Sequence, residues 1–283
     1  MEPAELERRQ RTIAAARADA PRRFNEVRLA RHGLMLYNRY DMYVGRSLAL
    51  YGEFSEYEVE LFENFVRPGG LIVDVGANIG THTLFMAHAV GVTGTVIAFE
   101  PQRLVFQALC ANLALNDIVN VMAYQCAVGC VAGSIKVPVL KPDEIQNFGG
   151  LMLGGAQEGE SVPVVTLDSL GLMKCSLIKA DVEGMEQDVL RGAEQTIRRH
   201  RPLLYVENDR AEKSAALIEL IQRFGYRLWW HLPPLYHPAN IAGNTDNVFP
   251  GIVSVNLLCV PREIPCNIKD LREVRGPEDT WRQ

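Results

Sequence analysis

The chain has 283 residues, of which 48% are hydrophobic and 22% charged, a composition typical of a folded protein rather than a disordered one. The formal charge is −5, from 29 Lys and Arg against 34 Asp and Glu. The chain therefore lacks the excess of basic residues that is typical of proteins that bind nucleic-acid backbones. No apolar run approaches the roughly 18–20 residues of a membrane-spanning helix, and the charged N-terminus lacks a secretory-signal pattern. We therefore expect a cytoplasmic protein with no membrane span and no nucleic-acid partner.

Six cysteines are spread through the chain, and no two have the C-x-x-C spacing of a zinc or redox site. Most lie in apolar stretches, where a free thiol behaves as a small hydrophobic side chain. We expect free, buried thiols and a reducing compartment.

The first 67 residues precede the regular part of the pattern. Residues 2–18 are rich in Ala, Glu and Arg, so we expect residues 1–25 to form an N-terminal helical extension that could join a homodimer. Short apolar runs broken by glycines predict an upstream segment over 26–67, with short strands and then a helix over about 55–66.

From residue 68 onward, short apolar runs alternate with helical segments. This alternation predicts an α/β domain over 68–262, with a mostly parallel sheet and helices on both faces. Predicted strands cover 71–75, 95–99, 121–125, 133–140, 162–167, 176–181, 203–207, 227–232 and 252–260. Predicted helices cover 80–90, 101–115, 185–200 and 210–224, and a glycine-rich loop covers 141–160. The polar tail over 263–283 is expected to wrap the surface.

The clearest local motif is the run DVGANIG over 74–80, which follows a predicted strand and opens a predicted helix. In a doubly wound sheet, such a glycine turn lets a ligand approach the backbone at the carboxyl end of the strand. Glu100 ends the next strand, 24 residues after Gly76. An acid at that place can accept hydrogen bonds from both hydroxyls of an adenosine ribose.

Two nucleotide cofactors compete for this loop. A dinucleotide site favours G-x-G-x-x-G and a helix N-terminus free to hold a pyrophosphate, whereas the spacing from Gly76 to Gly80 is G-x-x-x-G. Asp74 stands at the start of the loop, where its charge would repel a pyrophosphate but attract a cation. The pattern therefore favours S-adenosylmethionine (SAM), which carries a sulfonium and an ammonium, over a nicotinamide dinucleotide.

Further polar residues follow two later strands. Asp181 ends one buried strand and Glu183 lies in the turn after it, while Glu207 and Asn208 end the next strand. In a parallel sheet these ends open on the same edge as the glycine loop, so we expect several carboxylates in one cleft.

Those residues have three candidate uses and one structural alternative. Asp181 could act as a general base, or the acids could hold the ammonium of the cofactor. Asp181, Glu207 and Asn208 could instead ligate a divalent cation, which prefers oxygen ligands. The structural alternative is capping of the backbone N–H groups of the following helices.

Together these segments resemble the FkbM family of SAM-dependent methyltransferases over about residues 30–262. The matching blocks are VDVGANIGTHTLFMA (73–87), IAFEPQ (97–102), NLALN (112–116), AVG (127–129), LIKADVEGMEQDVLRGA (177–193) and PLLYVEND (202–209). The resemblance implies a Rossmann-like class I methyltransferase fold with a seven-stranded sheet, in which the strand 252–260 is inserted antiparallel. The expected SAM contacts are Asp74, Gly76, Ala77, Asn78, Gly80, Thr81, His82, Glu100, Pro101, Ala127 and Asp181.

The resemblance also implies an acceptor class, because family members methylate hydroxyls on polyketides, sugars and related metabolites. We expect O-methylation of a small-molecule or glycan acceptor, with Asp181 nearest the transferable methyl. The wider catalytic candidates are Asp181, Glu183, Glu207 and His231. Alternatives are a catalytically silent SAM-binding partner subunit and an N-methyltransferase of a small molecule or peptide.

One aromatic segment could form the wall of an acceptor pocket. Trp229, Trp230 and His231 are followed by two prolines and a long loop over 238–251, which together could make a wall or lid. A sugar or planar ring could stack on either tryptophan. Alternate residues of a strand face opposite sides, so at least one tryptophan is expected in the core.

Overall fold

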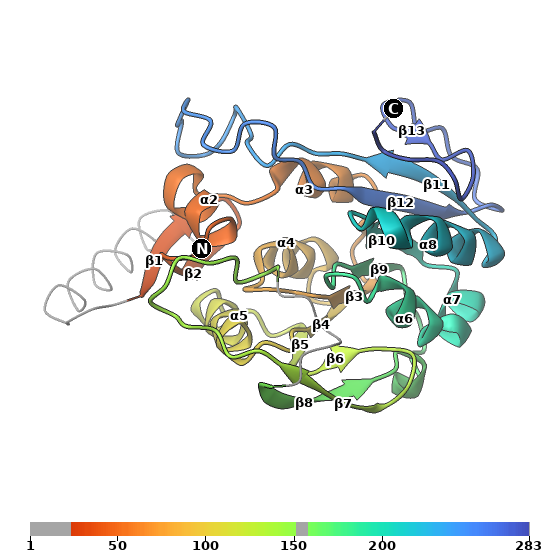
Figure 1. Cartoon of the computed structure of the whole chain (residues 1–283), viewed down its shortest axis with the longest axis horizontal. Coiled ribbons are helices and arrows are strands. Elements are labelled where there is room, and N and C mark those ends of the chain that lie inside the picture. Colours follow the sequence, from red (N-terminus) through yellow and green to blue (C-terminus); the bar gives the residue numbers. More distant parts are fainter. Residues whose placement is uncertain (1–23, 151–157, 283) are drawn as a thin grey trace, which may run out of the picture.

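The computed structural model describes residues 24–150 and 158–282, so the helix predicted over 2–18 lies outside the described residues. Its centre is an eight-stranded sheet (Figure 1). The strands follow in the order β13 (Arg272–Glu273), β11 (Tyr226–His231), β12 (Asn256–Pro261), β10 (Leu203–Glu207), β9 (Leu177–Ala180), β3 (Leu71–Val75), β4 (Thr95–Phe99) and β5 (Val121–Tyr124).

The sheet is parallel except near one edge. Strands β5, β4, β3, β9 and β10 pair in parallel, and β12 is inserted antiparallel between β10 and β11. The predicted fold class is therefore confirmed, including the antiparallel final strand. Two details differ: β12 begins at Asn256 rather than at 252, and the tail adds an eighth strand, β13, by pairing with β11.

Helices cover both faces of this sheet (Figure 1). Because side chains alternate along a strand, Ile72 packs with α4 (Thr81–Val90), whereas Val73 packs with the helices of the opposite face. The first face also carries α3 (Glu56–Glu63) and α5 (Arg103–Leu115), and the second carries α6 (Glu186–Arg191), α7 (Glu194–His200) and α8 (Ala211–Arg223).

The single helix predicted over 185–200 is in fact two helices, α6 and α7. The carboxylate of Asp168, in the short 3-10 helix η1 (Asp168–Leu170), accepts hydrogen bonds from the backbone N–H groups of Gln195 and Thr196 at 2.9 and 2.8 Å. This distant cap satisfies the first turn of α7 and so fixes a new helix start. A local pattern could not predict it, because Asp168 is 27 residues from Gln195.

The upstream segment forms a hairpin of β1 (Asn25–Ala30) and β2 (Gly33–Asn38), then α2 (Val44–Tyr51) and α3. Helix α2 was not predicted from the sequence. The buried carboxylate of Asp41 accepts hydrogen bonds from the N–H groups of Tyr43 and Gly45 and so stabilises its start. A separate three-stranded sheet contains β6 (Ala127–Val128), β8 (Glu160–Val165) and β7 (Gly133–Val137).

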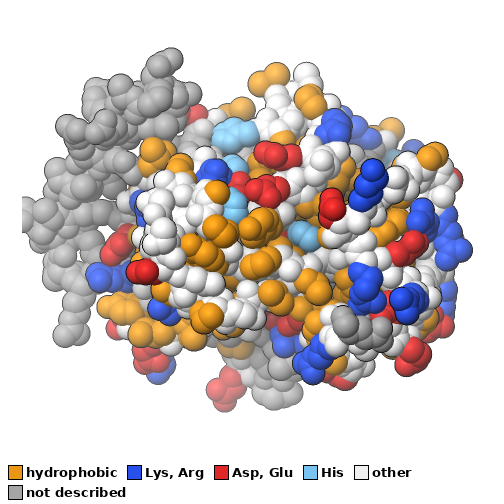
Figure 2. Space-filling model, turned by 90° about the horizontal axis from the view of Figure 1, so that it is seen from above, with side chains coloured by type: hydrophobic (Ala, Val, Ile, Leu, Met, Phe, Trp, Pro, Cys, Tyr) orange, Lys and Arg blue, Asp and Glu red, His pale blue; other side chains and the backbone are white. Residues whose placement is uncertain are grey.

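Other expectations concern the surface and the thiols. All six cysteines are free, but Cys110 and Cys130 are exposed rather than buried. Among the described residues, no helix is both long enough and apolar enough to cross a bilayer. Figure 2 shows basic, acidic and apolar side chains mixed on the upper face, with acidic side chains and histidines gathered near its middle.

Candidate active site

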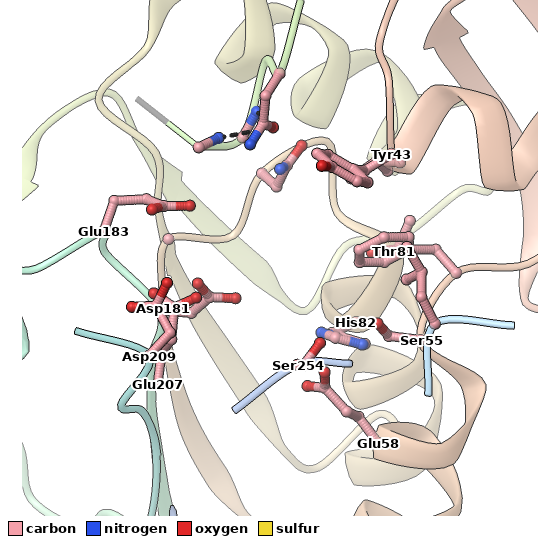
Figure 3. Close-up of a pocket in the computed structure, with 18 of the residues that line it drawn as sticks. Tyr43, Ser55, Glu58, Thr81, His82, Asp181, Glu183, Glu207, Asp209 and Ser254 are labelled. Carbon is pink, nitrogen blue, oxygen red and sulfur yellow. Dashed lines mark hydrogen bonds between the residues drawn. The ribbon is translucent and has the colours of Figure 1, made fainter. Parts of the chain in front are cut away.

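A cavity of about 300 Å³ opens beyond the carboxyl ends of β3, β9 and β10 (Figure 3). Helices α2 and α3 of the upstream segment close one side of it, and residues 252–255 close another. We call it the main cavity. Of the residues predicted from sequence, those that line it are Gly76, Ala77, Asn78, Thr81, His82, Asp181, Glu183 and Glu207.

The glycine loop lies directly against the end of β9. Gly76 has φ +78°, and a Cβ there would lie 1.8 Å from the carbonyl oxygen of Asp181. Asn78 also takes a left-handed conformation, with φ +52°, which a non-glycine residue adopts only when its surroundings hold it. At Gly76 the absence of a side chain therefore allows close approach between two strand ends, whereas the predicted approach of a ligand to the loop stays a prediction.

Glu100 supports this loop from behind. Its carboxylate accepts hydrogen bonds from the N–H groups of Asn78 (3.1 Å) and Gln102 (2.8 Å), and burial raises its pKa to about 7. Glu100 does not line the main cavity, so its contact with a ribose stays a prediction. The other expected SAM contacts outside the lining are Asp74, Gly80, Pro101 and Ala127.

A buried lysine that the sequence analysis overlooked organises the carboxylates. The β3–β9 register places Lys179 opposite Asp74, and its Nζ lies 3.4 Å from Asp74 Oδ1 and 3.3 Å from Asp181 Oδ2. Burial alone would lower the pKa of this lysine, but the charges of Asp181 and Asp74 raise it above the ordinary value. Asp74 is fully buried and also accepts a hydrogen bond from Thr83. Its charge therefore faces Lys179 rather than a ligand in the cavity.

The charged lining of the main cavity is strongly acidic. Among the described residues, one lysine, Lys179, faces five carboxyl groups, which belong to Glu58, Asp181, Glu183, Glu207 and Asp209. Burial and then the charge of Asp181 raise the pKa of Glu183 to about 7, and the same two causes raise that of Glu207 well above its ordinary value. Glu207 Oε2 is buried without a hydrogen-bond partner.

The trio expected to hold a metal ion is not brought together. Asn208 is buried outside the cavity lining, and its amide donates a hydrogen bond to Ser214. Glu183, Glu207 and Asp209 do have ligand atoms within 4.8 Å of one another. However, Arg210 already forms ion pairs with Glu183 and Asp209, so a side-chain cation occupies this acidic group.

Two further side chains, His82 and Glu58, meet on the α3 side of the cavity (Figure 3). Burial lowers the pKa of His82 to about 3, so its ring is neutral, and its Nε2 has no hydrogen-bond partner. Burial, and then the charge of Asp181, raise the pKa of Glu58 to about 7. Glu58 was not predicted as a site residue, because it lies on a short helix of the upstream segment, to which the sequence analysis assigned no chemical role.

The aromatic segment does not form the wall of this cavity. Trp229 and Trp230 are each 2% exposed and pack into the core on opposite faces of β11, so the stacking hypothesis is wrong. His231 hydrogen-bonds through Nδ1 to the hydroxyl of Tyr205 at 2.7 Å and lines a second cavity instead. The long loop over 238–251 does not line the main cavity, but the residues on either side of it do, and there Leu235 and Val253 supply apolar surface.

Comparison with known proteins identifies the family. The profile of the Methyltransferase FkbM domain matches residues 74–228. Methyltransferase 1 of Beauveria bassiana is 30% identical over 185 residues, which cover 56% of this chain and 74% of that protein. The 31-O-demethyl-FK506 methyltransferase FkbM of Streptomyces tacrolimicus is 33% identical over 162 residues, which cover 46% and 61%.

A similar solved structure is that of Methyltransferase FkbM from Methylobacillus flagellatus KT, with a TM-score of 0.46 and 20% identity. The match covers 71% of this chain and 50% of that one. The domain profile matches more than half of the chain, and its match begins at the glycine loop and extends through the acidic strand ends into β11. The chain therefore belongs to the FkbM family of SAM-dependent methyltransferases.

Proposed function

We propose that the main cavity binds SAM beside the glycine loop and transfers its methyl group to a hydroxyl of a small molecule or glycan. The observation that carries the proposal is the charge of the lining, where five carboxyl groups stand against one lysine. Such a lining attracts a sulfonium and an ammonium, and it offers little to a phosphate.

The residues have separate roles in this proposal. Gly76 and Asn78 give a ligand access to the backbone, and Glu207, with its unpartnered oxygen, accepts hydrogen bonds from an ammonium. Asp181 is half-exposed and held by Lys179, so its carboxylate orients or deprotonates the acceptor hydroxyl. Bound SAM supplies a methyl group on a positively charged sulfur, ready for in-line displacement. Holding the acceptor in line contributes to the rate by positioning.

Two observations support a hydroxyl as the group that accepts the methyl. The name of the Streptomyces tacrolimicus relative specifies a 31-O-demethyl substrate, and so an oxygen as the methylated atom in that protein. In this chain, apolar Phe54, Leu235 and Val253 lie beside the acids, which suits a hydroxyl on a largely apolar or ring-shaped molecule. The proposal includes no metal ion, because Arg210 already pairs with the acidic group.

Calorimetry with SAM and with S-adenosylhomocysteine tests the first step, and binding of both is expected. Radiolabelled SAM is then incubated with a panel of hydroxylated sugars, polyketides and their amino analogues. Methyl transfer to hydroxyls, reduced in Asp181→Asn while SAM affinity is kept, is the expected result. An Asp181→Asn protein with full turnover contradicts the role of Asp181, and absence of binding to either nucleoside contradicts the whole proposal. Binding without transfer to any compound favours a silent SAM-binding subunit.

A further inference from the structure

Helix α3 separates the main cavity from the second cavity. Glu58 lies on the side that faces the main cavity. Tyr57 and Glu60 line the second cavity, of about 530 Å³, together with His231 from β11. Neighbouring residues of α3 thus face two different spaces, and a buried layer lies beneath the helix.

That layer contains a chain of three buried polar side chains. The hydroxyl of Tyr205 lies 2.7 Å from Nδ1 of His231 on one side. On the other side it lies beside the carboxyl group of Glu58, and each of these two groups affects the pKa of the other. The exposed fractions of these three side chains are 1%, 4% and 8% for Tyr205, Glu58 and His231. The chain therefore connects the two cavities through groups that each can hold and release a proton.

The sheet register explains why the three side chains meet. In the antiparallel pairs, Asn256 lies opposite both Glu207 and His231, so the ends of β10 and β11 lie at the same level on either side of β12. Tyr205 precedes Glu207 by two residues and so faces the same side of the sheet, toward α3. The side chain of Asn256 also lies beside the Tyr205 hydroxyl.

A network with only a structural role would not need protonatable groups. It would also not need an end group in the lining of each cavity, as Glu58 and His231 are. Methylation of a hydroxyl releases one proton, which has to leave the site. We propose that Glu58, Tyr205 and His231 form a proton path that carries this proton from the main cavity to the second cavity. The proposal rests on the proposed O-methylation, and it gives Glu58 the role of proton acceptor while Asp181 orients the hydroxyl.

The step balances without any further reactant. The acceptor oxygen bonds the methyl carbon as the carbon–sulfur bond breaks and its electron pair stays on sulfur. The acceptor O–H proton passes to Glu58, a proton from Glu58 passes to the Tyr205 oxygen, and the hydroxyl proton of Tyr205 passes to Nδ1 of His231. The imidazole then releases its Nε2 proton to water in the second cavity, and exchange of ring and hydroxyl protons restores the starting state.

The charges around each end suit these roles. Glu58 faces Lys179 on β9, Asp181 just after that strand and Tyr205 on β10, and the side chain of Ser254 also lies beside it. Burial lowers the pKa of His231 to about 4, so the ring passes a proton on rather than retaining it. The charged groups that line the second cavity beside it are Glu60, Asp270 and Arg272.

Nuclear magnetic resonance of the histidine rings tests the path without any acceptor. The ring ¹⁵N shifts of His231, assigned with His231→Gln, are followed from pH 5 to 9 in the wild type, Glu58→Gln and Tyr205→Phe. We expect a step near pH 7 in the wild type, from the ionisation of Glu58, which disappears in both variants. The matched control is Tyr226→Phe, which removes another buried hydroxyl, bonded to the Pro202 carbonyl, and should keep the step.

A kinetic measurement distinguishes a path from a static network. With a hydroxyl acceptor from the panel, Tyr205→Phe should lower kcat about tenfold or more and change its solvent deuterium isotope effect, with KM within about twofold. Tyr226→Phe should change neither. A wild-type His231 that shows no step, a step that persists in Tyr205→Phe, or an unchanged kcat in Tyr205→Phe overturns the path. Failure of SAM binding in calorimetry would instead overturn the proposed function, because the ring shifts do not depend on it.

Discussion

At the scale of single residues, the site depends on contacts that allow little substitution. Gly76 has no room for a Cβ, because the Asp181 carbonyl would lie 1.8 Å away, and its φ of +78° adds strain for any other residue. The strain alone is of order 1–3 kcal/mol. The loop that is expected to hold SAM therefore packs directly against the strand end that carries Asp181.

Gly76→Ala should push these two segments apart and weaken SAM binding by at least about tenfold, since strain of this size is comparable with 1.4 kcal/mol per tenfold change. Isothermal calorimetry measures the affinity. Gly133→Ala is the matched control, because a Cβ at Gly133 meets nothing within 4 Å. Wild-type affinity in Gly76→Ala would disprove the close-approach argument.

Lys179→Met should leave Asp74 buried without its counter-charge and lower the free energy of unfolding by about 3–5 kcal/mol, the usual cost of breaking a buried pair. Urea unfolding measures the loss. Removing the charge of Asp74 as well, in Asp74→Asn/Lys179→Met, should recover part of it. The exposed Lys136→Met serves as control, and equal stability of the two single lysine variants would contradict the role of Lys179.

At the scale of elements, one carboxylate fastens the 233–251 loop to the upstream segment. Glu53, which precedes α3, is buried, and its oxygens lie 2.7 Å from His237 Nδ1, 2.8 Å from Arg31 Nε and 2.9 Å from the N–H of Ile241. Hydrogen bonds to a charged group contribute about 1.5–3 kcal/mol. Two segments that flank the main cavity are therefore positioned by a single side chain.

Glu53→Gln should loosen this loop while leaving the sheet intact, because the amide keeps the size of the side chain but not its charge. Hydrogen exchange at the Ile241 amide should become at least about tenfold faster, and exchange in β3 and β9 should not change. Glu63→Gln, at an exposed position of α3, is the control. If Ile241 remains as protected as in the wild type, Glu53 does not hold the loop.

At the scale of the whole molecule, the acidic cavity couples stability to pH and to ligand charge. The pKa values of Glu58, Glu100 and Glu183 are raised from the ordinary 4.5 to about 7, in each case chiefly by burial. The folded chain then binds more protons than the unfolded chain between pH 4.5 and 7. The contribution of these groups to the free energy of unfolding therefore falls as the pH rises through that window, and the folded state becomes less stable.

A cationic ligand should reverse this loss, because it favours the ionised carboxylates. The rise in Tm on adding saturating SAM should be several degrees larger at pH 8 than at pH 5.5, as measured by differential scanning calorimetry. Glu183→Gln should reduce the difference, whereas exposed Glu63→Gln should not. A ligand-induced rise in Tm that is independent of pH would contradict the assignment of a cation to this cavity.

The sequence by itself determined the elements of the domain and the place of the site. Buried strands such as LIVDV (71–75), the glycine loop and the acids at strand ends are local patterns, because strand, turn and helix preferences depend on neighbouring residues. Parallel strands open at one edge, so the convergence of Asp181 and Glu207 on the glycine loop also followed.

Only the tertiary structure decided which groups pair and which face the cavity. The register of β3 and β9 turned Asp74 toward Lys179, the packing of α3 brought Glu58 into the site, and the insertion of β12 joined Tyr205 to His231. These outcomes depend on side chains that are far apart in the chain, and on burial, which sets their pKa values. Local preferences carry no information about such distant contacts, because they arise only when the packed sheet fixes its register.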